Sequence, residues 1–213
     1  HMIRTTFSSL SQGAASPRLE VLVIGESAKE LRRVGKISPT KLPPLVIGRD
    51  PNEVAEGHDG YTFETYRVEV IPLPLGIGDY TIIGMEELVR VERKALKDMV
   101  ASLGARTPEF LLKADELGQF RWGRILAECR YHQVAYPPHG YYPWLPPYPD
   151  GKRRGAHPSS VRAALISADI RGSPVIWAGN RSAAEWWLVE YFRKLWGKHW
   201  EACHEVVNGK ALG

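Results

Sequence analysis

Apolar and polar positions alternate along this chain in two different periods, which together predict an α/β domain. Residues 19–24, 45–47, 66–71, 77–83, 88–93, 124–128 and 174–177 are predicted strands, with period-two alternation or a short apolar run. Residues 26–33, 95–103 and 159–168 are predicted helices, and two more start at Thr107 and Ser182. Because strands and helices interleave, the fold class is α/β, and an antiparallel pair makes the sheet mixed.

Two of the predicted helices have start signals. Thr107-Pro108 places proline at the first helical position, and the helix directs Phe110, Leu111, Ala114 and Leu117 to the core. Ser182 is predicted to open the last helix, with Glu185 at the capping-box position. The apolar residues of this last helix exceed one face. Most of them belong to the core, and the surplus could bury a dimer partner.

The strands at 77–83 and 88–93 are joined by four residues, a length typical of a hairpin loop. If Ile83 pairs with Leu88, the antiparallel register places Asp79 opposite Glu92, with Cβ atoms about 4.5–5.5 Å apart. A slip of one residue would separate the two carboxylates.

Strand alternation adds a lysine to this acid pair. Arg90, Glu92 and Lys94 share one face of their strand, and Arg93 lies on the other. Two facing carboxylates can share one Mg²⁺ at about 2.0–2.1 Å per oxygen. Solvated charges on a hairpin are the simpler interpretation. The partly apolar strand and the apolar-striped helix that follows it favour a site instead.

Composition restricts the function classes. The chain has 213 residues, 44% of them hydrophobic and 24% charged, as expected for one globular domain. A net charge of +4 suits a polyanionic partner. Two cysteines give no disulfide framework and fit a reducing compartment. No apolar run approaches the roughly 20 residues of a membrane span, and no signal peptide follows His1-Met2, which is typical of a cloning remnant.

The order of these residues resembles a known family. Gly78-Asp79-Tyr80, then Val91-Glu92-Arg93-Lys94 and Asp98, are similar to the signature of the XPF-type (excision-repair) nuclease domain. That family belongs to the restriction-endonuclease-like PD-(D/E)xK superfamily. The resemblance continues through Arg106 with Phe110, and through the strand that ends at Glu128, and it covers about residues 45–200. It implies a mixed central sheet flanked by helices, and a homodimer through the C-terminal half.

The resemblance also implies roles. Asp79 and Glu92 would bind Mg²⁺ or Mn²⁺, with the backbone carbonyl of Arg93 as a further ligand. Lys94 would orient the attacking water and offset charge on the phosphate. Asp98 either supports the site or, as an acid in the first turn of a helix, favours the helix dipole. The Arg93 side chain would pair with an acid such as Asp98. Glu128 either approaches the metal or is a surface acid at a strand end.

The first strand departs from the family pattern V-D-x-R-E, and two alignments are open. Val46-Ile47-Gly48-Arg49-Asp50 keeps the arginine and one acid but has Ile47 at the position of the first acid. Asp50-Pro51-Asn52-Glu53 keeps both acids and loses the arginine. The first alignment is favoured, so Arg49 and Asp50 are expected near the site.

Three regions are expected. Residues 1–44 form a partly flexible N-terminal extension, residues 45–200 form the nuclease domain, and residues 201–213 form a tail. A proline- and aromatic-rich insertion at 136–158 contains Lys152, Arg153 and Arg154. These three and Arg106 are candidates for binding nucleic-acid phosphates, with nearby rings stacking on bases, although a solvated loop explains the insertion equally well. With about a dozen residues after Trp200, no helix-hairpin-helix module is expected.

The leading hypothesis is a metal-dependent DNA endonuclease. It would cut branched, flapped or single-strand-containing DNA in repair, recombination or viral genome processing, inside a microbe or as a virus-encoded protein. A protein partner could supply targeting. The alternative is a non-catalytic DNA-binding or assembly module, which Ile47 favours. A nuclease directed at RNA is a third hypothesis.

Overall fold

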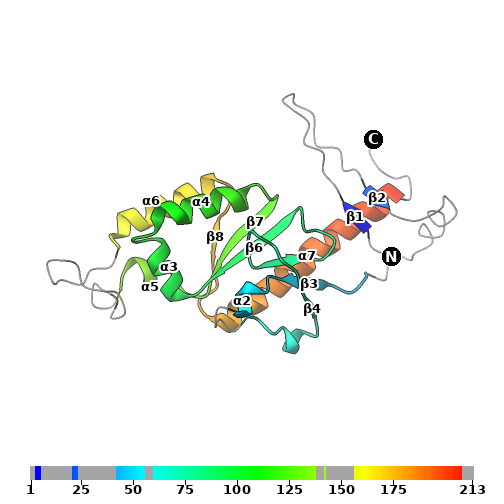
Figure 1. The fold of residues 1–213 in the computed structure, drawn as a ribbon, viewed down its shortest axis with the longest axis horizontal. Coiled ribbons are helices and arrows are strands. Elements are labelled where there is room, and N and C mark those ends of the chain that lie inside the picture. Colours follow the sequence, from blue (N-terminus) through cyan, green and yellow to red (C-terminus); the bar gives the residue numbers. More distant parts are fainter. Residues whose placement is uncertain are drawn as a thin grey trace, which may run out of the picture.

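A six-stranded mixed sheet lies at the centre of the domain (Figure 1). The structure is a computed structural model that describes residues 3–5, 21–23, 42–55, 60–137, 142 and 156–207. The strands are β3 (Val46–Arg49), β4 (Glu69–Pro72), β5 (Tyr80–Ile82), β6 (Val89–Lys94), β7 (Trp122–Ala127) and β8 (Val175–Trp177), in the order β4-β3-β5-β6-β7-β8. β5 is antiparallel to both neighbours, and the other pairs are parallel. The predicted α/β class with a mixed sheet is confirmed.

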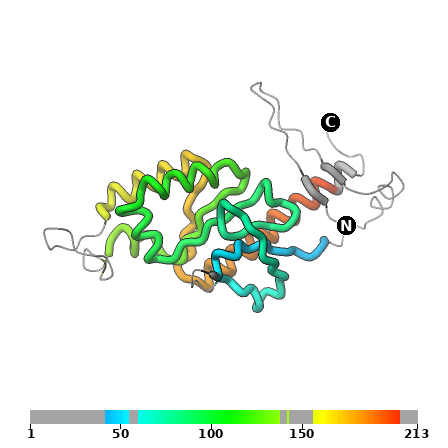
Figure 2. Tube along the Cα trace, viewed as in Figure 1, coloured from blue at the N-terminus to red at the C-terminus, as the bar shows by residue number. Residues whose placement is uncertain are grey.

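Helices cover both faces of this sheet (Figures 1 and 2). One face carries α3 (Leu96–Ser102), α4 (Thr107–Gly118), α5 (Tyr131–Ala135) and α6 (Pro158–Ile170), and the other carries α7 (Arg181–Val207). The short α2 (Asn52–Ala55) follows β3, and a 3-10 turn, η1 (Glu64–Tyr66), precedes β4. β1 (Ile3–Thr5) and β2 (Val21–Val23) pair antiparallel in a separate two-stranded sheet.

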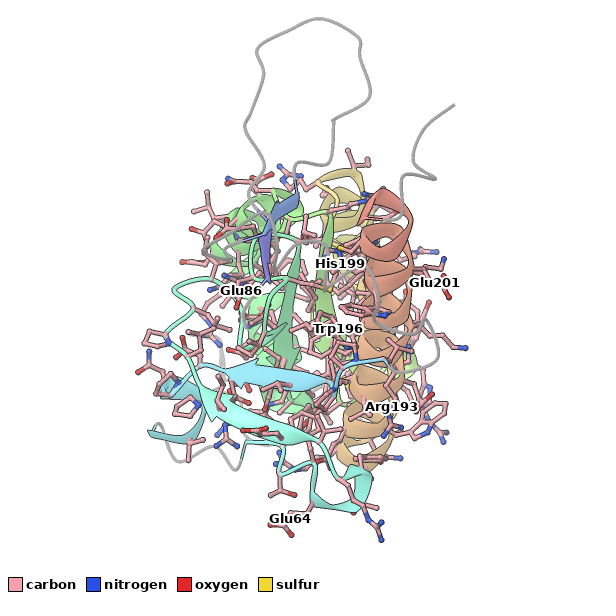
Figure 3. The ribbon with its side chains drawn as sticks, turned by 90° about the vertical axis from the view of Figure 1, so that its right-hand side faces the viewer. Glu64, Glu86, Arg193, Trp196, His199 and Glu201 are labelled. Carbon is pink, nitrogen blue, oxygen red and sulfur yellow. The ribbon has the colours of Figure 1, made fainter. Side chains whose placement is uncertain are left out.

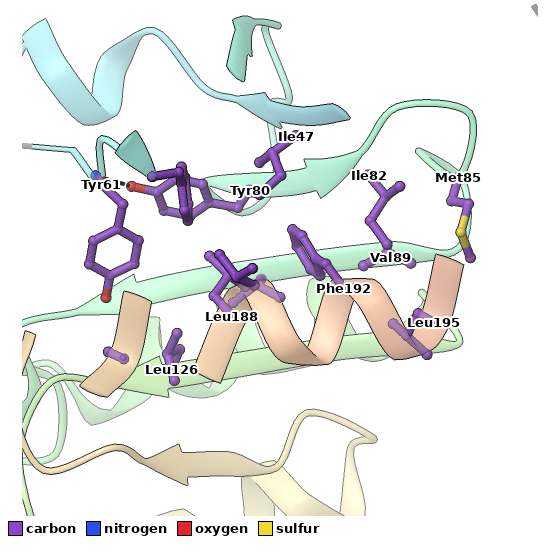
Figure 4. Close-up of a cluster of buried hydrophobic side chains, with 14 of the residues drawn as sticks. Ile47, Tyr61, Tyr80, Ile82, Met85, Val89, Leu126, Leu188, Phe192 and Leu195 are labelled. Atoms are coloured by element: carbon purple, nitrogen blue, oxygen red, sulfur yellow. Dashed lines mark hydrogen bonds between the residues drawn. The ribbon is translucent and has the colours of Figure 1, made fainter. Parts of the chain in front are cut away.

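The alternation of β6 and β7 divides the core between these two helical layers. Val89 and Val91 of β6 and Leu126 of β7 pack with α7 residues such as Leu188 and Phe192 (Figure 4). The neighbouring positions of β7, Ile125 and Ala127, pack with α3, α4 and α6. The predicted alternation of β6 is therefore confirmed, and it directs Glu92 and Lys94 toward the face that carries α3 and α4.

Helix α7 uses most of its surplus apolar residues inside the chain. Trp187, Tyr191 and Trp196 pack against the α7-side core, and the Trp196 indole Nε1 donates to the carbonyl of Pro43 at 2.9 Å. Figure 3 shows Trp196 and His199 on the sheet side of α7 and Glu201 on its outer side. Trp186 is 55% exposed. The homodimer stays a prediction, and among the described helices none is long and apolar enough to span a membrane.

The start of α7 corrects one prediction. Asn180, not Ser182, caps the helix: its side-chain oxygen accepts from the backbone N–H of Ala183 at 2.8 Å. Glu185 therefore does not close a capping box. Its carboxylate accepts from the backbone N–H of Phe63 at 2.6 Å and ties α7 to the segment before η1.

Other boundaries differ for local reasons. The strand predicted at 66–71 begins only at Glu69, because Tyr66 ends η1 and Arg67 has a left-handed φ of 52°. The helix α2, directly after β3, was not among the predicted elements. The N-terminal segment expected to be loose contains β1. The helix predicted at 26–33 and the basic cluster at 152–154 lie outside the described residues.

Candidate active site

A charged cavity of about 300 Å³ opens where β6 meets α3 and α4. Five acids and four bases line it, with one serine and one phenylalanine: Glu53, Asp79, Glu92, Asp98, Glu109, Arg93, Lys94, Arg106, Lys113, Ser102 and Phe110. Asp79, Glu92, Arg93, Lys94, Asp98 and Arg106 were predicted for the site from the sequence. The structure brings all six to this one cavity.

Asp79 is fixed by three hydrogen bonds at the start of β5. Tyr80 pairs with Val91, which is the predicted register. Ahead of that pair, the Asp79 N–H donates to the Val91 carbonyl, and the Asp79 carbonyl accepts from the Asp50 N–H, both at 2.8 Å. The Asp79 carboxylate accepts from the backbone N–H of Arg93 at 2.6 Å. The carboxylate is thereby held beside β6 at the level of Glu92.

Gly78 permits this turn into β5. Its φ of +75° lies in the left-handed region that glycine tolerates best. A Cβ at this position would lie 3.4 Å from both the Arg90 Cβ and the Val91 carbonyl oxygen. The glycine that precedes Asp79 is therefore required by backbone conformation.

The Glu92 carboxylate contacts two lysines. The Lys94 ammonium lies 3.0 Å from Glu92 Oε1, as expected for two residues on the same face of β6. The Lys113 ammonium, from α4, lies 3.6 Å from Glu92 Oε2. Lys113 was not predicted, because nothing in the sequence indicates which turn of α4 faces this carboxylate.

Burial and neighbouring acids raise the pKa of Asp79 well above its usual range. Desolvation is the largest cause, followed by the negative charges of Glu92 and Glu53. Such a carboxylate is stabilised in its ionised form by a nearby cation.

The donor set suits a hydrated divalent ion. Within the described part of the chain, no three His, Cys, Asp or Glu side chains converge on a metal position. Mg²⁺ is commonly held by only one or two carboxylates, with water and substrate phosphate completing its shell. Asp79 and Glu92, with the Arg93 carbonyl, are therefore the residues that could hold such an ion.

The Arg93 side chain belongs to a buried ion-pair network. Its guanidinium pairs with Glu53 and, at 2.9 Å, with Glu128, and lies 5.6 Å from the centre of the Tyr61 ring. Burial alone would lower the pKa of Arg93, but the hydrogen bonds and charges of Glu128 and Glu53 raise it. The expected partner, Asp98, is not in this network, so that pairing was wrong. The Arg93 guanidinium therefore reaches the cavity as the ion-pair partner of Glu53.

Glu128 also contacts Arg181 at the start of α7, where the two side chains approach to 3.6 Å. It is not among the residues that line the cavity. Glu128 therefore belongs to the ion-pair network and not to the residues that could hold a metal ion.

Glu53 is the cavity acid that the favoured alignment missed. It reaches the cavity from α2, and its signal was present in the second alignment, which ends at this residue. The favoured alignment assigned the first acid to the position of Ile47 in β3. Ile47 is fully buried in the α7-side core (Figure 4), so this position cannot present an acid to the cavity.

Arg49 and Asp50, which were expected near the site, have structural partners instead. Arg49 donates to the carbonyl of Tyr61 at 3.0 Å. The Asp50 carboxylate accepts from the backbone N–H groups of Asn52 and Leu75, at 2.9 and 2.7 Å. Neither residue lines the cavity. Asp50 contributes through its backbone: its N–H donates to the Asp79 carbonyl at 2.8 Å, and its own carbonyl accepts from the Glu53 N–H at 3.2 Å.

Asp79→Asn is expected to stabilise the metal-free protein. The pKa of Asp79 is higher in the folded protein than in the unfolded chain. The contribution of this acid to the free energy of unfolding is therefore fully present below its unfolded pKa of about 3.9, and it is lost as pH rises through its folded pKa. The neutral variant should therefore melt higher than wild type at pH 7.5 in EDTA, by about 2–4 °C per kcal/mol. The gain should shrink toward pH 4. Asp115→Asn, an exposed acid of α4, is the control, and equal melting of Asp79→Asn and wild type at pH 7.5 would refute this.

The mixed sheet, with an acid–acid–lysine cluster where β5 meets β6, defines a nuclease-type α/β domain. A family model confirms this: the chain belongs to the ERCC4 domain family, which matches residues 49–191. No curated protein sequence gave a significant match.

Two solved structures of XPF from Aeropyrum pernix are similar to this chain. One, in complex with DNA, has a TM-score of 0.50 and 21% identity, and the match covers 72% of this chain and 66% of that one. The other has a TM-score of 0.51 and 19% identity, with coverages of 70% and 64%. The chain thus spans just under two thirds of the length of these structures. At such identities the likeness concerns the fold.

Proposed function

We propose that this protein is a divalent-metal-dependent endonuclease that hydrolyses phosphodiester bonds in DNA. The observation that carries the proposal is the single cavity in which Asp79, Glu92 and Lys94 meet. Two carboxylates beside an ammonium suit the hydrolysis of a phosphodiester, whose charge rises in the transition state.

Asp79 and Glu92 would hold a Mg²⁺ or Mn²⁺ ion, with the Arg93 carbonyl as a further ligand. When bound, such an ion lowers the pKa of a coordinated water and stabilises charge on phosphate oxygens. The N–H of Arg93 keeps the Asp79 carboxylate oriented. Lys94, whose ammonium lies 3.0 Å from Glu92, would orient the attacking water and offset charge on the phosphate. Asp98 lines the same cavity, where it would support this arrangement.

DNA is the proposed substrate. One similar structure is an XPF in complex with DNA, and this chain has a net charge of +4. Arg106, an exposed residue that lines the cavity, would contact a backbone phosphate. Lys152, Arg153 and Arg154 would add to this contact surface. We propose branched, flapped or single-strand-containing DNA as the preferred form, in repair, recombination or viral genome processing.

The structure weakens the argument for a non-catalytic module. Ile47 favours such a module only if it replaces an active-site acid. Ile47 instead belongs to the hydrophobic core, and Glu53 brings an acid to the cavity from α2. With Asp79, Glu92 and Lys94 all retained, a catalytic protein is the better supported proposal.

The test is a panel of end-labelled flap, fork, Holliday-junction, single-stranded and duplex DNAs, incubated with Mg²⁺, with Mn²⁺ or with EDTA. A matched RNA should be included in each condition. We expect cleavage of at least one branched or flapped DNA with a divalent ion and no cleavage in EDTA. Binding of these DNAs without cleavage under any condition would favour the assembly-module alternative.

A further inference from the structure

The Glu92 carboxylate has a lysine beside each of its two oxygens. Lys94 lies 3.0 Å from one oxygen and Lys113 lies 3.6 Å from the other. Under the proposed function, one of these oxygens would bind a divalent cation. A divalent ion at an oxygen repels the ammonium beside it, so the contact between that lysine and Glu92 is weakened. The weakened lysine is then available for another partner.

Position and exposure identify Lys113 as the lysine that moves. Lys94 follows Glu92 by two residues on the same face of β6, so the strand itself keeps the two side chains together. Lys113 comes from a separate element, its contact is longer, and its side chain is 32% exposed compared with 16% for Lys94. Because the Lys113 side chain is the more exposed of the two, it is the one that can more easily turn toward a ligand entering from solvent.

Helix α4 fixes the backbone of Lys113, while the side chain is partly exposed to solvent. The residues on either side of it along the buried stripe, Phe110, Ala114 and Leu117, lie in the core on this face of the sheet. The lysine stem thus starts from a fixed point on the cavity wall formed by α4. That wall also carries Glu109, and Arg106 lies just before the helix.

We infer that Lys113 binds a non-bridging oxygen of the scissile phosphate. It would approach that phosphate from the α4 side, whereas Asp79 and Glu92 hold the cation from the β5–β6 side. The anion replaces Glu92 as the partner of Lys113, and the lysine offsets the charge that grows on the phosphate during hydrolysis. This inference rests on the proposed nuclease function and adds a second catalytic lysine to it.

The first test compares Lys113→Met and Lys113→Arg with wild type in single-turnover cleavage of flap DNA. Removing one buried electrostatic donor typically lowers kcat about 10²–10³-fold. For a partly exposed lysine we expect a loss of about 10-fold or more in Lys113→Met, with partial recovery in Lys113→Arg. Lys97→Met, an exposed lysine of α3 that does not line the cavity, is the matched control. Melting temperatures should be unchanged in all three variants.

The second test separates a phosphate contact from a merely structural role. Each non-bridging oxygen of the scissile phosphate is replaced in turn by sulfur. In wild type, Mn²⁺ should restore cleavage of the diastereomer whose sulfur faces the cation and not of the other. Lys113→Met should lose its sensitivity to sulfur only in that other diastereomer.

Two outcomes would overturn the inference: cleavage by Lys113→Met within about twofold of wild type, or a sulfur effect that is unchanged in the variant. Absence of cleavage by wild type itself would overturn the proposed function, and this inference with it.

Discussion

Glu92→Gln is expected to reduce DNA cleavage by about 10³-fold or more under single-turnover conditions. The substitution keeps the shape of the side chain but removes the charge that would hold the cation and that now pairs with Lys94. A bound metal ion supplies several kcal/mol of transition-state stabilisation, and each 1.36 kcal/mol is worth a factor of ten in rate. Gel-based cleavage of labelled flap DNA in Mg²⁺ measures the loss.

Glu116→Gln is the control for this variant, because Glu116 is an exposed acid of α4 outside the cavity lining. It should cleave like wild type. DNA binding by Glu92→Gln, measured by fluorescence anisotropy in Ca²⁺, should remain within a few-fold of wild type. Cleavage by Glu92→Gln at the wild-type rate would remove Glu92 from the mechanism.

Among the variants proposed, Arg93→Met is expected to lower the free energy of unfolding the most. The Arg93 side chain is 5% exposed and neutralises two buried acids, Glu53 and Glu128. Removing one partner of a buried ion pair costs about 3–5 kcal/mol, because the remaining charges are left without compensation. For a chain of this size that corresponds to a decrease in Tm of roughly 6–20 °C. Differential scanning calorimetry provides the measurement.

An exposed ion pair of α7 gives the matched comparison. Arg193 pairs with Glu190 at 2.8 Å, but its side chain is 44% exposed. Surface pairs contribute about 0–1 kcal/mol, so Arg193→Met should change Tm by only a few degrees. Equal changes in the two variants would show that the Arg93 network contributes no more than a surface pair.

Local pattern was sufficient to predict the hairpin that forms half of the site. The loop length set the register that pairs Tyr80 with Val91, and strand alternation separated Lys94 from Arg93. These rules act between residues that are close in sequence. The same is true of the apolar stripe of α4, where Phe110, Ala114 and Leu117 are buried as predicted.

Long-range contacts explain what the sequence could not indicate. Glu53 meets Arg93 across forty positions, and Lys113 meets Glu92 across twenty-one, through elements whose relative placement depends on the whole sheet. Arg49 and Asp50 fit a family pattern by type, but β3 enters the sheet with Ile47 toward the α7 core. An alignment compares residue types, whereas a residue lines the cavity only if the fold brings its side chain there.

The site is also expected to reduce the stability of the metal-free fold. Three acids, Glu53, Asp79 and Glu92, gather at one cavity, and their mutual repulsion contributes to the raised pKa of Asp79. A divalent ion would relieve this repulsion. Binding at 100 times its dissociation constant adds about 2.7 kcal/mol to stability. The proposed catalytic function and the expected metal-dependent stability thus have the same physical origin, the gathering of these acids at one cavity.

We propose that Asp79 and Glu92 together hold the catalytic ion. Titration of Mn²⁺ into the protein, with free Mn²⁺ followed by electron paramagnetic resonance, tests it without any assumption about the DNA substrate. We expect saturable binding to wild type and to Glu116→Gln, and loss of that binding in the double variant Asp79→Asn/Glu92→Gln. Equal Mn²⁺ affinity in wild type and the double variant would contradict it.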